Sequence, residues 1–227
     1  MQVRWLGHAS FLFTTPQGVR VLTDPYGPEV SPAAKEVEAD VVTVSHEHFD
    51  HNYLAGVKGQ PLVWRGLKED GQDWNEVNET FKDLHVYSIP VYHDEVQGEK
   101  RGKNTIFVFE VGDLRLAHLG DLGHVLEVEH AQKIGPLDIL MVPVGGYFTI
   151  DAREAWQVVG LLKPRLVFPM HYLTPGMRGF PIAKVDEFTS GRANVRHLGV
   201  SEVEVNKGNL PPETEVWVLS LNGGVTL

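Results

Sequence analysis

The sequence contains no cysteine among its 227 residues. This absence excludes disulfide bonds, metal sites built on thiolates and a cysteine nucleophile. Long hydrophobic runs are lacking too, because no stretch approaches about 18 uninterrupted apolar residues. The first residues, MQVRWLGH, have neither the basic segment nor the apolar run of a signal peptide. The sequence therefore predicts no membrane span, and a cytoplasmic location is expected by default.

Basic residues are in the minority. The chain has 20 Lys and Arg against 30 Asp and Glu, which gives a formal net charge of −10 and a pI near 5.5. This balance argues against a general binder of nucleic acids or of anionic membranes. The 42% of hydrophobic residues is ordinary for a globular protein and can form a sizeable core. Because no repeat or linker-like segment interrupts it, we expect residues 1–227 to form a single domain.

Short apolar runs between turn residues predict an α/β fold with central strands and outer helices. In the first half, strands are expected at 3–5, 10–14, 19–22, 41–45 and 84–90, a hairpin over 105–119, and an irregular segment at 65–83. In the second half, helices are expected at 125–134, from Asp151 to before Pro164, and at 183–189, with strands at 138–142, 166–168 and 216–221.

Four potential metal ligands lie in the run His46-Glu47-His48-Phe49-Asp50-His51, directly after the apolar segment 41–45. Neutral imidazole and carboxylate groups are ligands of Zn²⁺, Mn²⁺ and Fe. Alternate side chains of an extended backbone face the same way, so His46, His48 and Asp50 are expected on one side and His51 on another. One stretch can therefore serve two metal ions. The alternative interpretation is a solvated polar loop.

Other candidate ligands also follow predicted strands. His93, Asp121 and His171 each come shortly after an apolar run. Strand ends in α/β layers bring such side chains to one edge of a sheet. Gly120 and Gly123 are expected to let the backbone pass close to a bound ion. For His93 or His171 taken alone, the alternative is an ordinary hydrogen-bonded histidine.

On these residues the chain resembles the metallo-β-lactamase superfamily over nearly its whole length. The pattern His46-x-His48-x-Asp50-His51 is similar to the main metal motif of the family, and the later candidates follow in the order that the family uses. The segments 5–11, 101–105 and 168–172 resemble the branch that includes ascorbate-6-phosphate lactonase and short Zn-dependent hydrolases. The resemblance implies a four-layer αβ/βα sandwich, with two mixed β-sheets flanked by helices and a dinuclear site at one edge. It assigns His46, His48 and His93 to the first metal, Asp50, His51 and His171 to the second, and Asp121 to both.

The implied chemistry is metal-dependent hydrolysis of a small anionic ester or lactone. Two divalent ions, Zn²⁺ in the first place and Mn²⁺ or Fe as alternatives, would activate water. Asp50 is expected to orient or deprotonate that water, while His8 and His124 are candidate proton donors. Asp24 is expected to hold a ligating histidine from behind, with a plain turn residue as the alternative.

The substrate is expected to be a small anion. Arg101, Tyr147 and Arg178 are the candidate substrate-binding residues. The main alternative is a phosphodiesterase that acts on nucleotides or nucleic-acid ends. A non-catalytic metal-binding module of the same fold is a further alternative, against which the presence of all seven candidate ligands counts. No membrane or nucleic-acid partner is expected, and the sequence leaves the oligomeric state open, with a homo-oligomer as one possibility.

Overall fold

Two β-sheets face each other in the computed structural model, which describes residues 1–69, 71–177 and 179–221. The first sheet has the order β15 (Glu202–Glu204), β1 (Gln2–Gly7), β2 (Ser10–Thr14), β3 (Arg20–Thr23), β5 (Val41–Val44) and β7 (Leu62–Arg65). The second has the order β14 (Val195–His197), β16 (Glu215–Val218), β13 (Leu166–Met170), β12 (Ile139–Pro143), β11 (Leu114–His118), β10 (Lys103–Val111), β9 (Leu84–Tyr92) and β8 (Asn78–Phe81).

The core lies between these sheets and is built by alternation along the strands. Phe11 and Phe13 of β2 point inward and are fully buried, as are Phe107 and Phe109 of β10. The Phe13 and Phe109 rings meet edge to face, with 5.1 Å between their centroids. Because each side chain of this kind buries a large apolar area, the inner faces hold the two sheets together.

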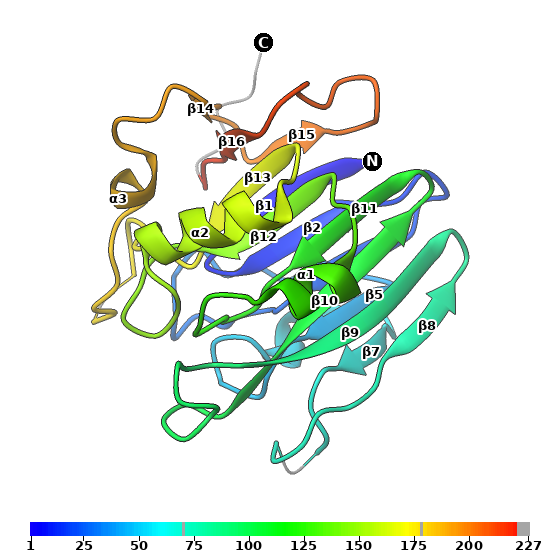
Figure 1. Ribbon diagram of the computed structural model, residues 1–227. Helices are drawn as coiled ribbons and strands as arrows, with labels where there is room; N and C mark the ends of the chain where they lie inside the picture. The colour runs from blue at the N-terminus through cyan, green and yellow to red at the C-terminus, as the bar shows by residue number, and fades with distance from the viewer. Residues whose placement is uncertain (70, 178, 222–227) are drawn as a thin grey trace.

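The two outer layers differ. Helices α1 (Val128–Ile134) and α2 (Ala152–Leu162) lie over the outer face of the eight-stranded sheet (Figure 1). The first turn of α2 is closed by the predicted capping box, in which Glu154 N–H donates to Asp151 (2.8 Å). The six-stranded sheet is covered instead by the short ribbon of β4 (Val37–Glu38) and β6 (Val57–Lys58) and by a 3₁₀ turn, η1 (Leu54–Gly56). The predicted sandwich is confirmed, with its α-helical cover on one side within the described residues.

Most predicted strands and helices occur, with bounds that differ by a few residues. The helix predicted at 125–134 begins at Val128, and the one predicted at 183–189 is the short α3 (Asp186–Thr189). The expectation of an irregular segment at 65–83 is wrong in part, because residues 78–81 form β8. This strand pairs only with β9 at the edge of the sheet and exposes polar side chains, so it lacks the apolar pattern of an inner strand. None of the described helices is long and apolar enough to span a membrane.

The ends of several strands meet at one edge of the sandwich. Strands β11, β12 and β13 run parallel, and β5 runs parallel to β3 and β7. His46 follows β5, Asp121 follows β11 and His171 follows β13, while His93 directly follows β9. The connectivity of the sheets therefore brings residues far apart in sequence to a common place.

Candidate metal centre

All seven predicted ligands lie together at this edge. His46, His48 and His93 form one cluster, in which one ligand atom of each lies within 4.8 Å of the others. Asp50, His51 and His171 form a second cluster together with His8, by the same measure. The first set matches the assignment that the resemblance implied, and the second adds His8 to it. The role of each residue as a ligand stays a prediction.

Asp121 lies between the two clusters. Its Oδ2 is 3.2 Å from His93 Nε2 and 3.2 Å from His171 Nε2, and its Oδ1 is 3.2 Å from His51 Nε2. His46 Nε2 is 3.9 Å from Oδ2. Burial alone would raise the pKa of Asp121, but the neighbouring His171 and His51 outweigh it and hold that pKa well below its ordinary range. The carboxylate is therefore ionised and faces histidines of both clusters.

A turn after His48 determines which of the two clusters each ligand of the run 46–51 joins. Extended backbone would have placed Asp50 with His46 and His48. Instead, His51 N–H donates to the His48 carbonyl (3.0 Å), and this turn carries Asp50 into the second cluster beside His51. The expectation from strand alternation is wrong for Asp50, because the chain leaves the extended conformation after β5.

The buried polar atoms of the centre fit metal ions. His46 Nε2, His51 Nε2, His171 Nε2 and Asp121 Oδ1 have no hydrogen-bond partner among the described residues. Buried polar groups without partners are rare in folded proteins, and imidazole nitrogen and carboxylate oxygen suit Zn²⁺, Mn²⁺ and Fe. Burial lowers the pKa of His46 and of His48, so both rings are neutral and keep a lone pair for a metal.

Asp24 holds two of these histidines from behind. Its carboxylate accepts hydrogen bonds from His51 Nδ1–H (2.9 Å), from the Ser45 backbone N–H (2.8 Å) and from the Ser45 hydroxyl (2.5 Å). Because that hydroxyl donates to Asp24, it accepts from His46 Nδ1–H (2.9 Å). Both rings therefore turn Nε2 toward Asp121, the arrangement that a supporting carboxylate gives a ligating histidine. Ser45 was missed in the sequence, where only its position directly before His46 could have indicated it.

His8 lies within the second cluster. Its Nε2 is 3.0 Å from Asp50 Oδ2, and its ring is 4.2 Å from that of His171. Burial and the neighbouring His171 lower the pKa of His8 to about 4, so the ring is neutral near pH 7 and donates Nε2–H to Asp50. Burial would raise the pKa of Asp50, but His51 and the contact with His8 hold it below its ordinary range.

His124 is occupied by the backbone. Its Nδ1 is 3.0 Å from the Val125 carbonyl, and its Nε2 accepts a hydrogen bond from Tyr92 N–H (3.3 Å). With both ring nitrogens in use, His124 holds the segment after Asp121 against β9. This geometry gives no support to the predicted proton donor, because a donor needs a nitrogen directed at the substrate.

Gly123 allows two segments of the chain to pack closely together. A Cβ at this position would lie 2.1 Å from the backbone carbon of His93, so the segment after Asp121 packs directly on the segment that carries His93. At Gly120 a Cβ would lie 2.4 Å from Asn104 Oδ1. Both glycines permit close approach between chain segments, and the expected close approach to a bound ion stays a prediction. Asn104 fixes the turn there, since Nδ2 donates to the Leu119 carbonyl (2.9 Å) and Oδ1 accepts from Asp121 N–H (3.2 Å).

Backbone strain gathers at the predicted site. Seven non-glycine residues of the described chain have positive φ, and four of them are predicted site residues: His8, Asp24, Tyr147 and His171, with φ of 50°, 41°, 62° and 52°. This conformation costs about 1–3 kcal/mol per residue and is kept where surrounding contacts impose it. The packing around the centre therefore determines the orientation of these side chains.

Two of the three predicted substrate-binding residues lie together. Arg101 Nη2 donates to the Tyr147 carbonyl (2.7 Å), and the guanidinium lies 5.7 Å from the Phe148 ring centroid. Tyr147 is 64% exposed, so its ring is available to a ligand. Arg178 lies outside the described residues.

The loop that carries Arg101 is organised by Asp94, the residue after His93. Its buried carboxylate accepts backbone hydrogen bonds from four residues, at distances of 2.7–2.9 Å: Val96, Gly98, Lys100 and Arg101. Burial alone would raise the pKa of Asp94, but these N–H donors outweigh it and lower that pKa below its ordinary value.

We expect Asp94→Asn to lower the free energy of unfolding at pH 7 by about 2 kcal/mol, because charge-assisted hydrogen bonds are lost. A carboxyl with a lowered folded-state pKa stabilises the fold above its unfolded pKa of about 3.9, and this contribution is lost as the pH falls toward the folded-state value. The difference between the proteins should therefore shrink below about pH 4. Urea unfolding from pH 7 to pH 3 measures it, with Asp113→Asn in the exposed β10–β11 turn as control. A difference that stays constant with pH would contradict this account.

Comparisons with known proteins agree with this geometry. A family model described as a beta-lactamase superfamily domain matches residues 2–171. The chain belongs to the metallo-β-lactamase superfamily. A UPF0173 metal-dependent hydrolase from Carboxydothermus hydrogenoformans is 32% identical over 92% of this chain and 99% of its own length. Another, from Anaeromyxobacter sp. strain K, is 33% identical over 87% of this chain and 84% of its own.

A solved structure extends the likeness to the whole fold. The crystal structure of a protein from Thermotoga maritima, assigned as a Zn-dependent hydrolase of the metallo-β-lactamase superfamily, superposes with a TM-score of 0.76 at 33% identity. The match covers 96% of this chain and 97% of that protein. Together with the His and Asp cluster, these relatives place the chain among the metal-dependent hydrolases of the superfamily.

Proposed function

We propose that this metallo-β-lactamase-family enzyme hydrolyses a small anionic ester or lactone at a dinuclear metal centre. The observation that carries the proposal is the position of Asp121 between two clusters of ligand atoms, within 3.2 Å of histidines in each. Two divalent ions held there, Zn²⁺ first, would supply a water of lowered pKa and a positive field for developing negative charge.

The protein side chains set the orientation of the reacting groups. Asp50 belongs to the second cluster and has its Oδ2 held by His8 at 3.0 Å. We assign Asp50 to orienting the attacking water and His8 to positioning Asp50, rather than to donating the proton to the leaving group. A neutral His8 that donates to a carboxylate keeps that carboxylate in one rotamer, and fixed orientation of the reacting groups lowers the barrier to reaction.

A substrate anion is favoured by the charges at the centre. Two divalent ions outweigh the carboxylates of Asp50 and Asp121, and a positive charge of about one remains if a hydroxide is also present. Arg101, anchored by the Asp94 loop, supplies a second positive group near Tyr147. Arginine recognises carboxylate and phosphate groups through paired N–H donors.

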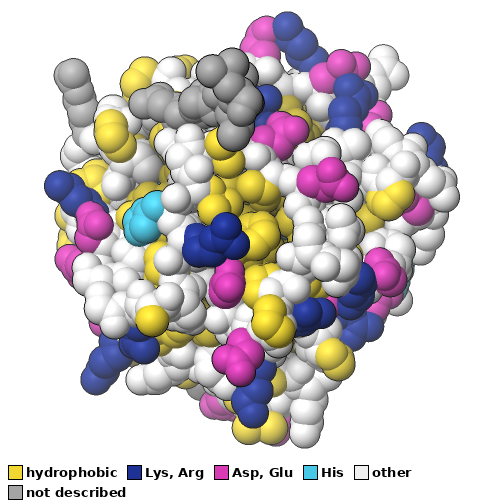
Figure 2. All heavy atoms as spheres, turned by 90° about the horizontal axis from the view of Figure 1, so that it is seen from above, with side chains coloured by type: hydrophobic (Ala, Val, Ile, Leu, Met, Phe, Trp, Pro, Cys, Tyr) yellow, Lys and Arg dark blue, Asp and Glu magenta, His cyan; other side chains and the backbone are white. Residues whose placement is uncertain are grey.

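The net charge, and the one face that Figure 2 draws, argue against a polynucleotide as substrate. Figure 2 shows Lys and Arg side chains interspersed with Asp and Glu on the face it presents, around a hollow of hydrophobic side chains. Binding of nucleic acids requires a continuous positive surface, since affinity depends on the number of phosphates neutralised. The net charge of −10 points the same way. A phosphodiesterase acting on nucleotides is the alternative that the assay below distinguishes.

Initial rates measured with Zn²⁺-loaded and Mn²⁺-loaded protein test the proposal. A carboxylate-bearing lactone, its uncharged amide and bis(p-nitrophenyl) phosphate are assayed side by side. We expect metal-dependent lactone opening, faster for the carboxylate, with the preference reduced about tenfold in Arg101→Gln through a higher KM. Lys100→Gln is the control, because Lys100 pairs with Glu95 at the surface. Faster phosphodiester cleavage would favour the alternative, and no turnover of any substrate with metal bound would favour the non-catalytic module.

A further inference from the structure

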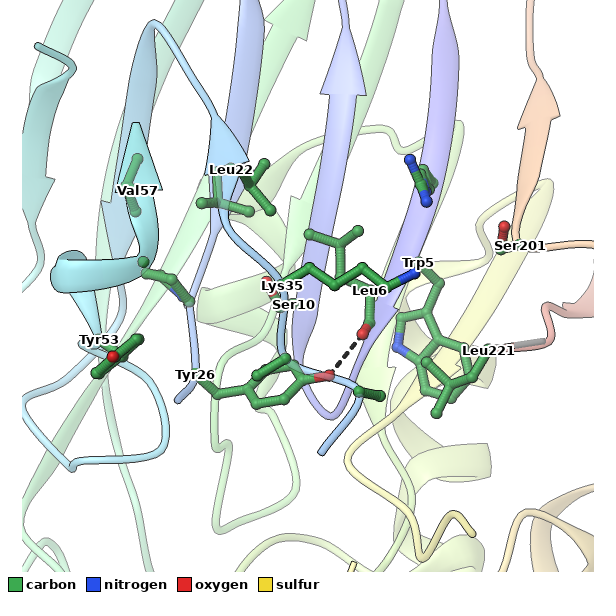
Figure 3. Close-up of a pocket in the computed structure, with 16 residues that line it drawn as sticks. Trp5, Leu6, Ser10, Leu22, Tyr26, Lys35, Tyr53, Val57, Ser201 and Leu221 are labelled. Atoms are coloured by element: carbon green, nitrogen blue, oxygen red, sulfur yellow. Dashed lines mark hydrogen bonds between the residues drawn. The ribbon is translucent and has the colours of Figure 1, made fainter. Parts of the chain in front are cut away.

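A cavity of about 180 Å³ lies on the outer face of the six-stranded sheet (Figure 3). One of its lining rings, that of Tyr26, is 6.0 Å from the ring of His8. The apolar lining of the cavity includes Leu6 of β1, Leu22 of β3 and Val57 of β6. The rings of Tyr26 and Tyr53 and the indole of Trp5 also line it. None of the seven candidate metal ligands lines this cavity.

The cavity exists because the covering layer here is not a helix. Pro25, Pro28 and Pro32 interrupt the segment between β3 and β4, which folds as turns. The wall is fixed by Tyr26, whose hydroxyl donates to the Leu6 carbonyl at 2.6 Å (Figure 3). Gly7 permits this contact, since a Cβ there would lie 2.5 Å from the Tyr26 hydroxyl oxygen. The space is therefore held open by packing rather than by loose chain.

The charge at the cavity has one sign. Arg4 and Lys35 line it, while the described lining residues include no Asp or Glu. Lys35 extends its side chain along the cavity in Figure 3. The ion pairs formed within the described residues do not include Arg4 or Lys35, although Glu202 is the cross-strand partner of Arg4 on β15.

Two neighbouring cations differ from Arg4 and Lys35 in this respect. Acidic residues outnumber basic ones, and nearby cations are paired: Arg20 with Asp40 and Glu38, and Lys58 with Glu36. Arg4 and Lys35, which form no ion pair among the described residues, lie beside an apolar cavity and fit a ligand that brings both an apolar body and a negative charge. A cavity of about 150 Å³ in another protein holds one benzene molecule, which sets the size of the apolar body.

We propose that this cavity binds a small organic carboxylate whose apolar part has the size of a benzene ring. The apolar part lies against Leu6, Leu22 and Val57, and the carboxylate faces Arg4 and Lys35. The ligand site is separate from the metal centre and does not depend on the proposed hydrolytic function. Trp5 is shared between them, because it lines the cavity and its Nε1–H donates to the His8 carbonyl (3.1 Å).

Calorimetric titration with benzoate, benzamide and benzylamine tests the charge requirement at constant shape. We expect benzoate to bind at least about tenfold more tightly than benzamide, and benzylamine more weakly than either. Arg4→Gln and Lys35→Gln should each weaken benzoate binding about tenfold and leave benzamide unchanged. Lys133→Gln on α1, an exposed lysine on the opposite sheet, is the matched control and should bind benzoate normally.

Two further measurements separate this cavity from other sites. Ala34→Phe introduces a ring from the covering segment into the cavity and should abolish binding, while thermal unfolding verifies that this variant is folded. Benzoate should bind to the metal-free protein, since no candidate ligand lines the cavity, and the titrations are therefore made without metal. Binding that requires metal, that survives Ala34→Phe, or that does not distinguish benzoate from benzamide would overturn the proposal.

Discussion

Replacing Asp121 by asparagine is expected to reduce kcat/KM by at least about 10³-fold, because in the proposed function this carboxylate would hold both metal ions. Such a group contributes several kcal/mol to catalysis, and each 1.4 kcal/mol is tenfold in rate. The carboxylate approaches His51, His93 and His171 at 3.2 Å, so its loss affects both clusters directly. An amide keeps the shape but removes the negative charge and one acceptor oxygen. The loss should therefore appear in metal content as well as in rate.

Metal analysis of the purified variant, together with initial rates at saturating Zn²⁺, measures both effects. If the protein binds two ions per chain, as proposed, we expect the variant to bind one or none. Asp113→Asn removes an acidic group from an exposed turn on the neighbouring hairpin and should change neither quantity. If Asp121→Asn retained two ions and the full rate, the assignment of Asp121 to a shared position would be wrong.

The composition of the centre could be predicted from sequence because its residues are marked locally. Metal-ligating residue types follow apolar runs, and strand ends in a layered α/β fold converge. The pairing of ligands could not be derived in this way. Strand alternation assigned Asp50 to the wrong cluster, because it assumes an extended backbone and the chain turns where His51 N–H donates to the His48 carbonyl.

The supporting residues could be predicted less well. Ser45, Asp94 and Asn104 act through hydrogen bonds to chain segments up to 21 residues away, and single polar residues carry no periodic signal. Asp24 was found because it ends a strand, but its alternative as a plain turn residue was equally open. Its three hydrogen bonds to Ser45 and His51 favour the first interpretation, in which Asp24 supports a candidate ligand.

The strands of the fold likewise divide into those that the sequence predicted and those that it did not. Inner strands such as β2 and β10 have apolar inward positions and were predicted, because burial on the core face imposes alternation. Edge strands such as β7, β8 and β15 are short and partly exposed, so their sequences resemble loops. The helix-free cover of the six-stranded sheet also escaped prediction, although the prolines at 25, 28 and 32 are a signal for it.

Asp24→Ala is expected to destabilise the protein by about 3 kcal/mol, because three buried donors lose their acceptor at once. These donors are the Ser45 backbone N–H, the Ser45 hydroxyl and His51 Nδ1–H. The affinity for metal should fall about 10–100-fold as well, since His51 and, through Ser45, His46 lose the partner that directs Nε2 toward the centre. Urea unfolding and competition with a chelator measure the two effects.

Asp24→Asn separates stability from ligand orientation. The amide oxygen can still accept from the Ser45 backbone N–H, but the amide nitrogen is a donor and would face His51 Nδ1–H or the Ser45 hydroxyl. We therefore expect Asp24→Asn to recover part of the lost stability and little of the lost metal affinity, while Asp113→Ala changes neither. Equal recovery of both would mean that Asp24 acts on the metal centre only by stabilising the fold.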